Sequence, residues 1–462
     1  MQITRTPLPT PRPTQFLPTP PASIAEWLQV SGSEAVAHAC DLLRNSGAPL
    51  LVTGAAGTGK SHLISLYLEE CKERAVVLAS TGVAALRIGG QTVHSYFRLP
   101  PRVLAKLENV SPERLRLYAA ADAILIDEIS MLRADTVDAI DRLLRRARRS
   151  HLPFGGVRVI FVGDPYQLAP VVKPSDADVL RTLGYTSGWF FDARVFREYP
   201  LRVAVLDVVH RQTDRQFIDI LSRARMGRIT PADLALLNAR AGVPAVSAQS
   251  NTSLKLTAHR SAADQDNLQR LDQIQGHEML LKGSIEGVFP DRELPVPLSL
   301  RMKATARVMF VRNDPDRRWV NGTMGTLLSR VDDDSLLVQI DGSRGDPCVV
   351  RRVTWEHLHH TYNRAARRVE VEVLGTYQQF PLVLGWAATV HKTQGVSLDR
   401  VRIDLGNGAF AAGQSYVALS RVRSLAGLEL VRPLTLEDIW TDPLVSEFMR
   451  KVERRERHHD AA

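Results

Sequence analysis

The chain has 462 residues and a formal net charge of +9, with 44% hydrophobic and 24% charged residues. This composition fits a folded protein of about three domains, and it excludes a membrane-spanning protein, because no apolar run reaches the roughly 18 to 20 residues that cross a bilayer. The three cysteines lie far apart without a CxxC pair, which indicates reduced thiols in a cytoplasmic protein. The excess of Lys and Arg favours a polyanionic partner, since these side chains release counterions from a phosphate backbone.

The first part of the chain alternates strand-like and helix-like segments after a biased N-terminus. Residues 1–22 are so rich in Pro and Thr that we predict a disordered or extended arm. From 23 to 200, apolar segments alternate with amphipathic ones, which predicts a first α/β domain with a parallel sheet covered by helices. Its strands are predicted at 48–54, 75–80, 121–128 and 157–164, and its first helix at 61–73.

The rest of the chain predicts a second α/β domain in two pieces, at 201–284 and 386–435. Between them, residues 285–385 hold strand-like segments separated by Gly, Asp and Asn, as in a small β-barrel or meander. The sequence therefore predicts two α/β domains with a β-rich subdomain inserted in the second. The tail at 436–462 is charged and is predicted to form a solvated helix.

The segment GAAGTGKS, residues 54–61, fits the phosphate-loop pattern G-x-x-x-x-G-K-[ST]. It follows a predicted strand and opens a predicted helix, which is the context that the pattern requires. We expect its backbone N–H groups to hold phosphate oxygens, Lys60 to reach the β- and γ-phosphates and Ser61 to bind Mg²⁺. The predicted nucleotide-binding residues here are Gly54, Ala55, Ala56, Gly57, Thr58, Gly59, Lys60, Ser61 and His62.

Two further motifs fit the same nucleotide site. Asp127 and Glu128 leave an apolar strand in AILIDEIS, and ligands of α/β sheets bind at the carboxyl ends of strands. We predict that Asp127 completes the Mg²⁺ shell and that Glu128 activates the attacking water. Gln167 in VGDPYQLAP is predicted to sense the γ-phosphate, because its amide both donates and accepts hydrogen bonds. These elements indicate ATP hydrolysis but not its purpose, since kinases, GTPases and motors share the loop.

Four segments of the chain resemble the petite-integration-frequency (Pif) helicases, relatives of the RecD-like helicases. They are STGVAALRIGGQTVHSYF at 80–97, the segment at 140–171 that contains PFGGVRVIFVGDPYQLAPV, AATVHKTQGVSLDRVRIDL at 387–405 and GQSYVALSRVRSL at 413–425. They occur in the order found in that family, and VMFVRND and RRWVNGTMGTL also resemble its inserted β-rich segment. The resemblance spans about residues 34 to 432, nearly the whole chain. The resemblance implies two RecA-like P-loop domains that bind ATP between them, move 5′ to 3′ on single-stranded DNA and unwind forked or tailed duplex DNA.

The resemblance also implies roles for single residues. Arg211 in VVHRQ and Arg421 in VALSRVR match arginines that the second domain presents to the γ-phosphate, and Gly395 in VHKTQG falls in the nucleotide site. A guanidinium suits that role because it stays charged and offers a planar fork of donors. The DNA-binding residues that the resemblance implies are Thr81, Gly82, His94, Phe97, Phe154, Trp319, Asn321, Thr389, His391 and Lys392.

Several of these DNA-binding positions have a second interpretation. Phe97 and His94 also suit the core of the first domain. The glycines after Phe154 also suit a plain turn from helix to strand. Trp319 and Asn321 also suit a role in holding the inserted subdomain together, which we favour.

The chain departs from the family at two places. Glu34-Ala35 stands where the family has a Glu-Gln pair that reads adenine, so the strictness of the ATP preference stays open. The segment 98–118, where the family carries a duplex-separating wedge, is short, and we expect modest unwinding.

Other functions fit parts of the same sequence. One alternative is a translocase that strips proteins from single-stranded DNA without unwinding. A small-molecule kinase conflicts with the strand-binding motifs, and a non-catalytic DNA-binding module conflicts with the complete set of hydrolysis residues. We expect a monomeric motor core in the cytoplasm, at the nucleoid if bacterial, that serves DNA replication, repair or telomere maintenance.

Overall fold

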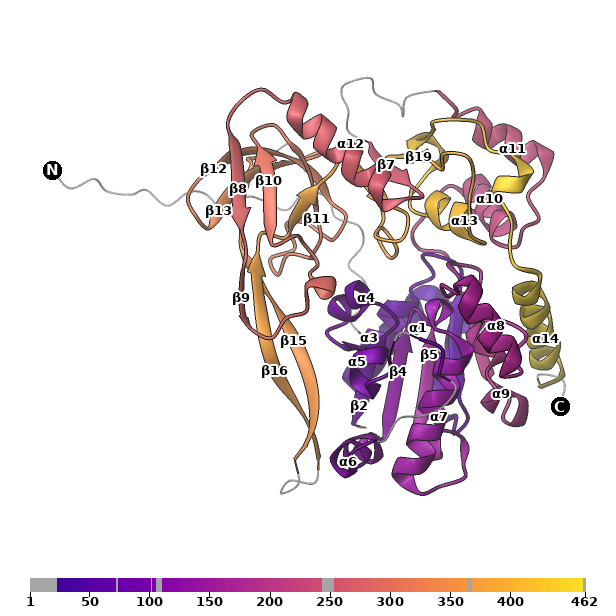
Figure 1. Ribbon diagram of the computed structural model, residues 1–462. Helices are drawn as coiled ribbons and strands as arrows, with labels where there is room; N and C mark the ends of the chain where they lie inside the picture. Colours follow the sequence, from indigo (N-terminus) through magenta and orange to yellow (C-terminus); the bar gives the residue numbers. More distant parts are fainter. Residues whose placement is uncertain are drawn as a thin grey trace.

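The computed structural model describes residues 23–71, 74–100, 102–104, 110–242, 253–343, 345–363 and 368–459. Two α/β bodies lie one above the other in Figure 1, and a β-rich body flanks both. The arm predicted at 1–22 lies outside the described residues. Among the described residues, no helix combines the length and the apolar character that crossing a membrane requires.

The first α/β body is built on one parallel sheet of six strands in the order β3-β2-β4-β5-β1-β6. Two strands at its centre are buried along their whole length, as their unbroken apolar runs require. Alternate residues serve opposite faces, so that Ile124 and Ile126 join one apolar core and Leu125 joins another. The strands are β1 (Leu50–Gly54), β2 (Ala75–Ala79), β3 (Gln91–Thr92), β4 (Ala123–Asp127), β5 (Arg158–Val162) and β6 (Arg202–Leu206).

The helices of this body cover both faces of its sheet (Figure 1). Side-chain caps fix several of their starts, and Ser33 and Ser111 accept the backbone N–H groups that open two of them. The helices are α1 (Ile24–Ser31), α2 (Glu34–Asn45), α3 (Lys60–Glu70), α4 (Gly82–Arg87), α5 (Val93–Phe97), α6 (Pro112–Ala120), α7 (Ala134–Arg148), α8 (Pro174–Thr182) and α9 (Val195–Glu198), with 3₁₀ turns at Ile129–Met131, Pro153–Gly156 and Phe190–Asp192.

The second α/β body carries a parallel sheet of four strands in the order β18-β7-β19-β20. Strands from both pieces of the predicted second domain meet in it. A capping box of Thr230 and Asp233 starts one of its helices. Its elements are β7 (Leu254–Thr257), β18 (Ala387–Thr389), β19 (Val401–Asp404), β20 (Leu428–Leu430), α10 (Arg215–Arg225), α11 (Pro231–Asn238), α12 (Arg260–Gln273) and α13 (Gln414–Leu419), with 3₁₀ turns at Leu425–Gly427 and Leu436–Asp438.

The inserted subdomain is antiparallel throughout the described strands and contains sheets of five, three and two strands. Phe310, Tyr377 and Phe380 are central to its own apolar core. Its elements are β8 (Glu278–Lys282), β9 (Ser284–Gly287), β10 (Ser299–Lys303), β11 (Arg307–Phe310), β12 (Met324–Arg330), β13 (Ser335–Ile340), β14 (Cys348–Arg351), β15 (Val353–Asn363), β16 (Arg368–Gln379) and β17 (Leu382–Leu384), with a 3₁₀ turn at Asp291–Glu293.

The long hairpin of β15 and β16 leaves this subdomain and runs down beside the first body (Figure 1). His360 on the hairpin contacts Gln91 through Nδ1 and Oε1, 2.9 Å apart. Its neighbour His359 contacts Arg114 of α6, with Nε2 2.8 Å from a guanidinium nitrogen. The inserted subdomain is therefore connected to both α/β bodies.

The structure moves two of the predicted domain boundaries. The strand Arg202–Leu206 pairs with β1 in the first sheet, so that sheet continues past the boundary expected at 200. The antiparallel strands begin with β8 at Glu278, before the start expected at 285. In both cases the boundary depends on which partner a strand pairs with, and an apolar run of five residues does not reveal its partner.

The C-terminal helix α14 (Pro443–His459) forms as predicted, but it is packed on the protein along one side and is not a solvated helix. Val445 and Met449 are buried against Tyr166 and Trp189 of the first body. Phe448 stacks on Phe191, with ring centroids 4.4 Å apart. The helix thus follows the second body in sequence but packs on the first, and it holds the two together at the edge of the molecule (Figure 1).

Candidate nucleotide site between two domains

The phosphate loop connects β1 to α3, as its sequence predicts. Lys60 is the first residue of α3, and its Nζ donates to the carbonyl oxygens of Gly54 and Ala55 at 2.8 and 2.9 Å. Burial lowers the pKa of Lys60 to about 8. The ammonium therefore lies inside the loop, at the amino end of a helix that favours phosphate.

The predicted acidic pair lies at the carboxyl end of β4. Asp127 is 4% exposed, and its Oδ1 accepts the backbone N–H of Glu128 at 2.8 Å. Glu128 has a φ of 53°, which is rare for a residue with a side chain. Burial, together with the neighbouring Asp127 charge, raises the pKa of Glu128. The pair concentrates negative charge where the sequence predicts Mg²⁺ and the attacking water.

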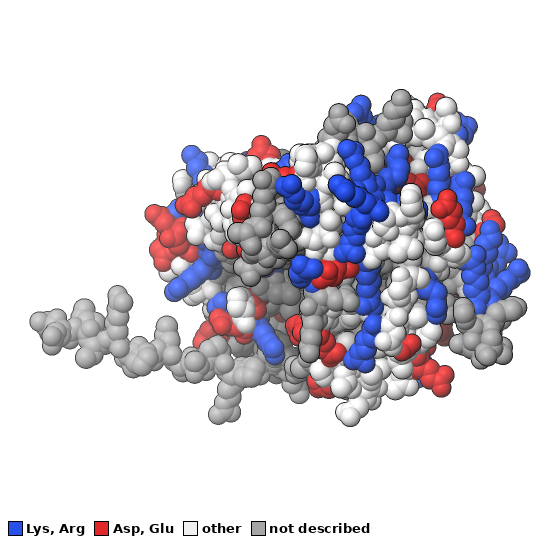
Figure 2. Space-filling model, turned by 90° about the horizontal axis from the view of Figure 1, so that it is seen from below, with Lys and Arg blue, Asp and Glu red and all other residues white. Residues whose placement is uncertain are grey.

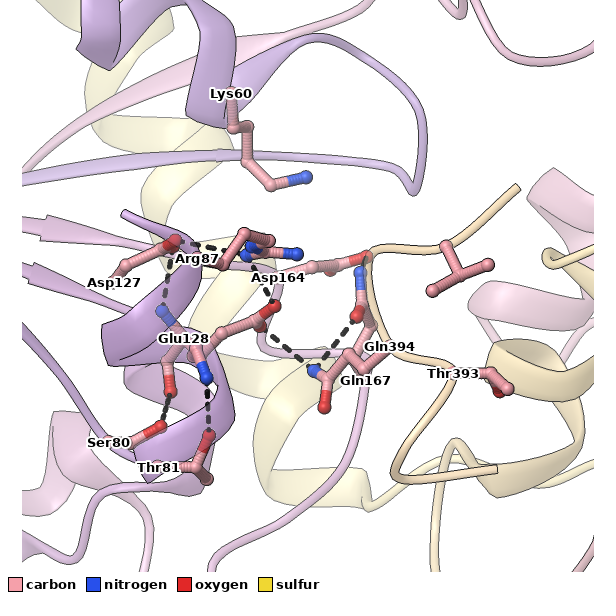
Figure 3. A network of polar contacts seen from close by, with 12 residues as sticks. Lys60, Ser80, Thr81, Arg87, Asp127, Glu128, Asp164, Gln167, Thr393 and Gln394 are labelled. Atoms are coloured by element: carbon pink, nitrogen blue, oxygen red, sulfur yellow. Dashed lines mark hydrogen bonds and ion pairs between the residues drawn. The ribbon is translucent and has the colours of Figure 1, made fainter. Parts of the chain in front are cut away.

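A chain of amide contacts connects this pair to the second body (Figure 3). Gln394 Nε2 donates to Glu128 Oε2 at 2.9 Å and to Gln167 Oε1 at 3.3 Å. Gln167 in turn donates to Asp164 Oδ2 at 3.4 Å. Gln167 therefore lies beside the predicted base, and a residue of the second body bridges the two.

Arg87, the last residue of α4, lies in the site but is not among the predicted residues. One of its guanidinium nitrogens lies 3.2 Å from Asp127 Oδ2 and 3.4 Å from Glu128 Oε1. It also lies against Gly395, whose φ of 79° and lack of a side chain leave room for the guanidinium. Gly395, predicted to contact nucleotide, thus contacts this arginine. The motif STGVAALRIGG contains Arg87, but only the fold brings it to residues forty positions later.

The two predicted arginines of the second domain approach the site from its far side. Arg211 packs over Gly57 of the phosphate loop and donates to Ser420 O at 3.2 Å. Burial lowers its pKa to about 10. Arg421 is 1% exposed and donates to the carbonyls of Val417 and Thr393 at 2.9 and 3.2 Å. Arg421 is therefore buried and Arg211 is partly buried, and both guanidinium groups are anchored to the backbone of the second body.

Two further contacts across the cleft were missed as well. Arg225 of α10 forms a buried ion pair with Asp164, with its terminal nitrogen 2.8 Å from Oδ1. The hydroxyl of Tyr416 accepts the backbone N–H of Ala56 in the phosphate loop at 2.8 Å. Both pairs join residues from different domains. Because the partners lie far apart in the sequence, no local motif indicates that they meet. They place the second domain directly on the nucleotide site.

Three aromatic residues that the resemblance places among the DNA-binding residues have their rings in the apolar core. Phe97 is 2% exposed and packs on Tyr118, and Phe154 is 1% exposed and packs on Phe161. Trp319 is 5% exposed and stacks on Phe310, with centroids 4.5 Å apart. The ring of each is buried within its own domain, which favours the core interpretation of all three.

The turn after Phe154 has a structural reason of its own. Gly155 has a φ of 64° and lies against the carbonyl of Leu144, where a side chain would clash. The N–H of Phe154 donates to Asp141 Oδ1 at 2.6 Å. The turn is thus fixed to the end of α7, as expected for a helix-to-strand connection.

The other predicted DNA residues are spread over both α/β bodies and the insertion. Thr81 caps α4 by accepting the N–H of Ala84 at 3.2 Å, and Gly82 lies beside Glu293 of the insertion. Thr389 is buried and accepts the N–H of the exposed Lys392 at 3.3 Å. The remaining three, His94, Asn321 and His391, are partly exposed.

His62, predicted beside the nucleotide, faces the N-terminal helix. Its ring lies 5.0 Å from that of Trp27 in α1, and Trp27 also lies 6.1 Å from His210. Trp27 packs against Gly59 of the phosphate loop. This aromatic cluster supports the outer side of the loop.

A phosphate loop, an acidic pair at the end of another strand of the same sheet and arginines from a second α/β domain define a two-domain P-loop nucleoside triphosphatase. The family model of PIF1-like helicases matches residues 32–234. The ATP-dependent DNA helicase Pif1 of Bdellovibrio bacteriovorus is 34% identical, over 90% of this chain and 91% of that protein. The PIF1 helicase of Danio rerio is 32% identical over 84% of this chain, which spans 59% of that relative. This chain belongs to the Pif1 family of ATP-dependent DNA helicases.

Solved structures of Pif1 helicases match the whole fold. Pif1 of Bacteroides sp in complex with ADP-AlF4 is 31% identical, with a TM-score of 0.83 over 92% of this chain and 97% of that one. Bacteroides Pif1 bound to single-stranded DNA is 32% identical, with a TM-score of 0.66 over 92% of this chain and 97% of that one. A structure of DNA unwinding at forked duplex by two coordinating Pif1 helicases is 30% identical, with a TM-score of 0.66 over 92% of this chain. The two α/β bodies are therefore RecA-like domains, as predicted.

Proposed function

We propose that this helicase hydrolyses Mg²⁺-ATP in the cleft between its RecA-like domains, moves 5′ to 3′ along single-stranded DNA and unwinds tailed duplex. The observation that carries this proposal is the contact chain from Glu128 through Gln394 to Gln167, because it joins the predicted base to the second domain. A change at the γ-phosphate would thus change how the two domains meet, which is how nucleotide state drives a motor.

The residues that would hold ATP and Mg²⁺ fit those groups. Lys60 and the loop N–H groups offer donors for phosphate oxygens. The carboxylate of Asp127 and the hydroxyl of Ser61 are hard oxygen ligands of the kind that Mg²⁺ prefers. Bound Mg²⁺ would neutralise charge on the phosphates. Arg211 and Arg421 would stabilise charge on the transferring phosphoryl group from the second domain.

Single-stranded DNA is proposed to run across both RecA-like domains. The Bacteroides relative that shares this fold was solved bound to single-stranded DNA. In this chain Thr81, Gly82 and His94 on one domain and Thr389, His391 and Lys392 on the other offer hydroxyls, backbone amides and a cation suited to phosphates. On the face seen from below in Figure 2, Lys and Arg side chains gather in a band, and such a band favours a polyanionic partner in general.

We propose that one copy of the chain forms the motor and that it works in the cytoplasm, at the nucleoid in a bacterium. The ATP-binding cleft is supported by residues of one chain from both domains, so it requires no second copy. The relative at forked duplex uses two coordinating helicases, and cooperation of two copies there is compatible with a motor that is complete in one chain.

The unwinding proposal is tested with two duplexes that differ only in which strand carries a single-stranded tail. We expect strand separation from the duplex with the 5′ tail, because a 5′ to 3′ motor loads there and runs into the junction. Fluorescence of a dye-quencher pair at the duplex end reports it, and Glu128→Gln serves as the blank. Separation from the 3′ tail alone would overturn the polarity. DNA-stimulated hydrolysis with no separation on either substrate would favour the translocase.

A further inference from the structure

Arg87 is a cation that the hydrolysis chemistry described above does not use, yet it touches both acidic side chains. Its guanidinium lies 3.2 Å from Asp127 and 3.4 Å from Glu128, while its side chain is only 28% exposed. Burial alone would lower the pKa of Arg87, but the Glu128 and Asp127 charges outweigh it and raise the pKa. The acidic pair therefore has a strong, partly desolvated partner before any substrate is considered.

The segment that carries Arg87 contacts the acidic pair at both of its ends (Figure 3). At its start, Ser80 Oγ donates to the carbonyl of Glu128 at 2.9 Å, and the Ser80 N–H donates to the carbonyl of Asp127 at 3.2 Å. At its end, Arg87 binds the two carboxylates. Between these contacts lie Thr81 and Gly82, which are proposed to bind DNA. The residues proposed to bind DNA thus lie on a segment that is joined to the acidic pair on both sides of them.

The guanidinium is also in contact with the second domain. It packs against Gly395, where any side chain would collide with it. The adjacent Gln394 binds the other oxygen of the Glu128 carboxylate at 2.9 Å. Glu128 is therefore held from two sides, by Arg87 of the first domain and by Gln394 of the second. A carboxylate that accepts both contacts has fewer free lone pairs for a water molecule.

We propose that Arg87 is a positioning residue that restrains ATP hydrolysis until single-stranded DNA binds. In the restrained state, its guanidinium holds the contacts with Glu128 and Asp127 described above. DNA bound at Thr81 and Gly82 shifts α4, withdraws the guanidinium and frees the pair for the metal and the water. This inference rests on the proposed function, because it assigns to one residue the stimulation by DNA that such a motor requires.

The test compares the unmodified chain with Arg87→Gln, which removes the charge but keeps a polar side chain of similar reach. Arg87→Lys keeps the charge without the fork that joins two carboxylates. Arg44→Gln is the matched control, because Arg44 pairs with Glu70 on the surface, away from the site. Each chain is assayed for ATP hydrolysis with and without oligo-dT, and for oligo-dT affinity by fluorescence anisotropy.

We expect Arg87→Gln to hydrolyse ATP without DNA at least about fivefold faster, the low end of typical allosteric couplings. The DNA-saturated rate should stay close to that of the unmodified chain, so the stimulation factor falls. The oligo-dT affinity should rise, because DNA binding no longer has to break the Arg87 contacts. Arg87→Lys should lie between the two, and Arg44→Gln should match the unmodified chain. An unchanged stimulation factor in Arg87→Gln, or equal losses with and without DNA, would overturn the proposal.

A second readout does not depend on turnover. Binding of a fluorescent, non-hydrolysable ATP analogue is titrated with Mg²⁺ in the absence of DNA. Removing a competing cation from Asp127 should lower the half-saturating Mg²⁺ concentration in Arg87→Gln, whereas an unchanged or higher value contradicts the restraint. If the unmodified chain shows no stimulation by oligo-dT, the proposed function itself fails. If the unmodified chain is stimulated and Arg87→Gln behaves in the same way, only this inference fails.

Discussion

Glu128→Gln is expected to lower the rate of ATP hydrolysis by roughly 10²- to 10⁴-fold, the usual contribution of a general base. The amide keeps the size of the side chain and still accepts a hydrogen bond from Gln394, but it cannot take a proton from water. Burial and the neighbouring Asp127 charge raise the pKa of the carboxyl, which makes the carboxylate a stronger base. The loss should therefore fall on the chemical step.

The measurement is single-turnover hydrolysis with enzyme in excess over ATP, with and without oligo-dT. Nucleotide affinity and oligo-dT affinity at low salt should stay within about twofold of the unmodified chain, since the phosphate and strand contacts come from other residues. Glu69→Gln on the exposed face of α3 is the matched control. Hydrolysis that survives in Glu128→Gln, or DNA binding lost with the fold intact, would contradict the assigned role.

Nucleotide affinity is expected to fall as the pH rises above about 8, because Lys60 loses its charge there. Burial lowers the pKa of Lys60 to about 8, so below that pH the ammonium is already charged and ready to bind phosphate. Above it, binding must be accompanied by uptake of a proton, since phosphate oxygens stabilise only the charged form. Affinity should then decline by roughly tenfold for each further pH unit.

A fluorescent ADP analogue titrated from pH 7 to 9.5 measures this dependence. Lys60→Arg is the matched comparison, because a guanidinium stays charged throughout that range. Its affinity should be lower overall but flat with pH. Lys60→Ala should bind weakly at every pH. An affinity of the unmodified chain that is constant across the range would show that the ammonium is charged throughout, against the effect of burial described above.

Elements with a local sequence signature were predictable. The phosphate loop, its flanking strand and helix, and the acidic pair on β4 are each specified within about ten residues by glycine placement and apolar runs. The strands of the insertion were also visible from alternating apolar residues and turn residues. The resemblance to Pif helicases added the pairing of two RecA-like domains, which periodicity alone does not provide.

Features that depend on tertiary contacts were not predictable. Nothing near Arg87 in the sequence indicates that its guanidinium reaches Asp127 and Glu128, and the pair of Arg225 with Asp164 joins different domains. Phe154 sits in a glycine-rich turn, which suggests exposure, yet its ring fills the core. In α14, buried Val445, Met449 and Val452 form an apolar stripe, because they are spaced by about one helical turn. The many charged residues around them favoured the wrong prediction of a solvated helix.

The central claim is that the cleft between the two domains is an ATPase engine controlled by single-stranded DNA. Its most direct test is the steady-state rate of ATP hydrolysis by the full chain, with and without oligo-dT, with Glu128→Gln as the blank. We expect hydrolysis that depends on Glu128 and rises when oligo-dT is added. Hydrolysis by the unmodified chain at the same rate with and without DNA would contradict it.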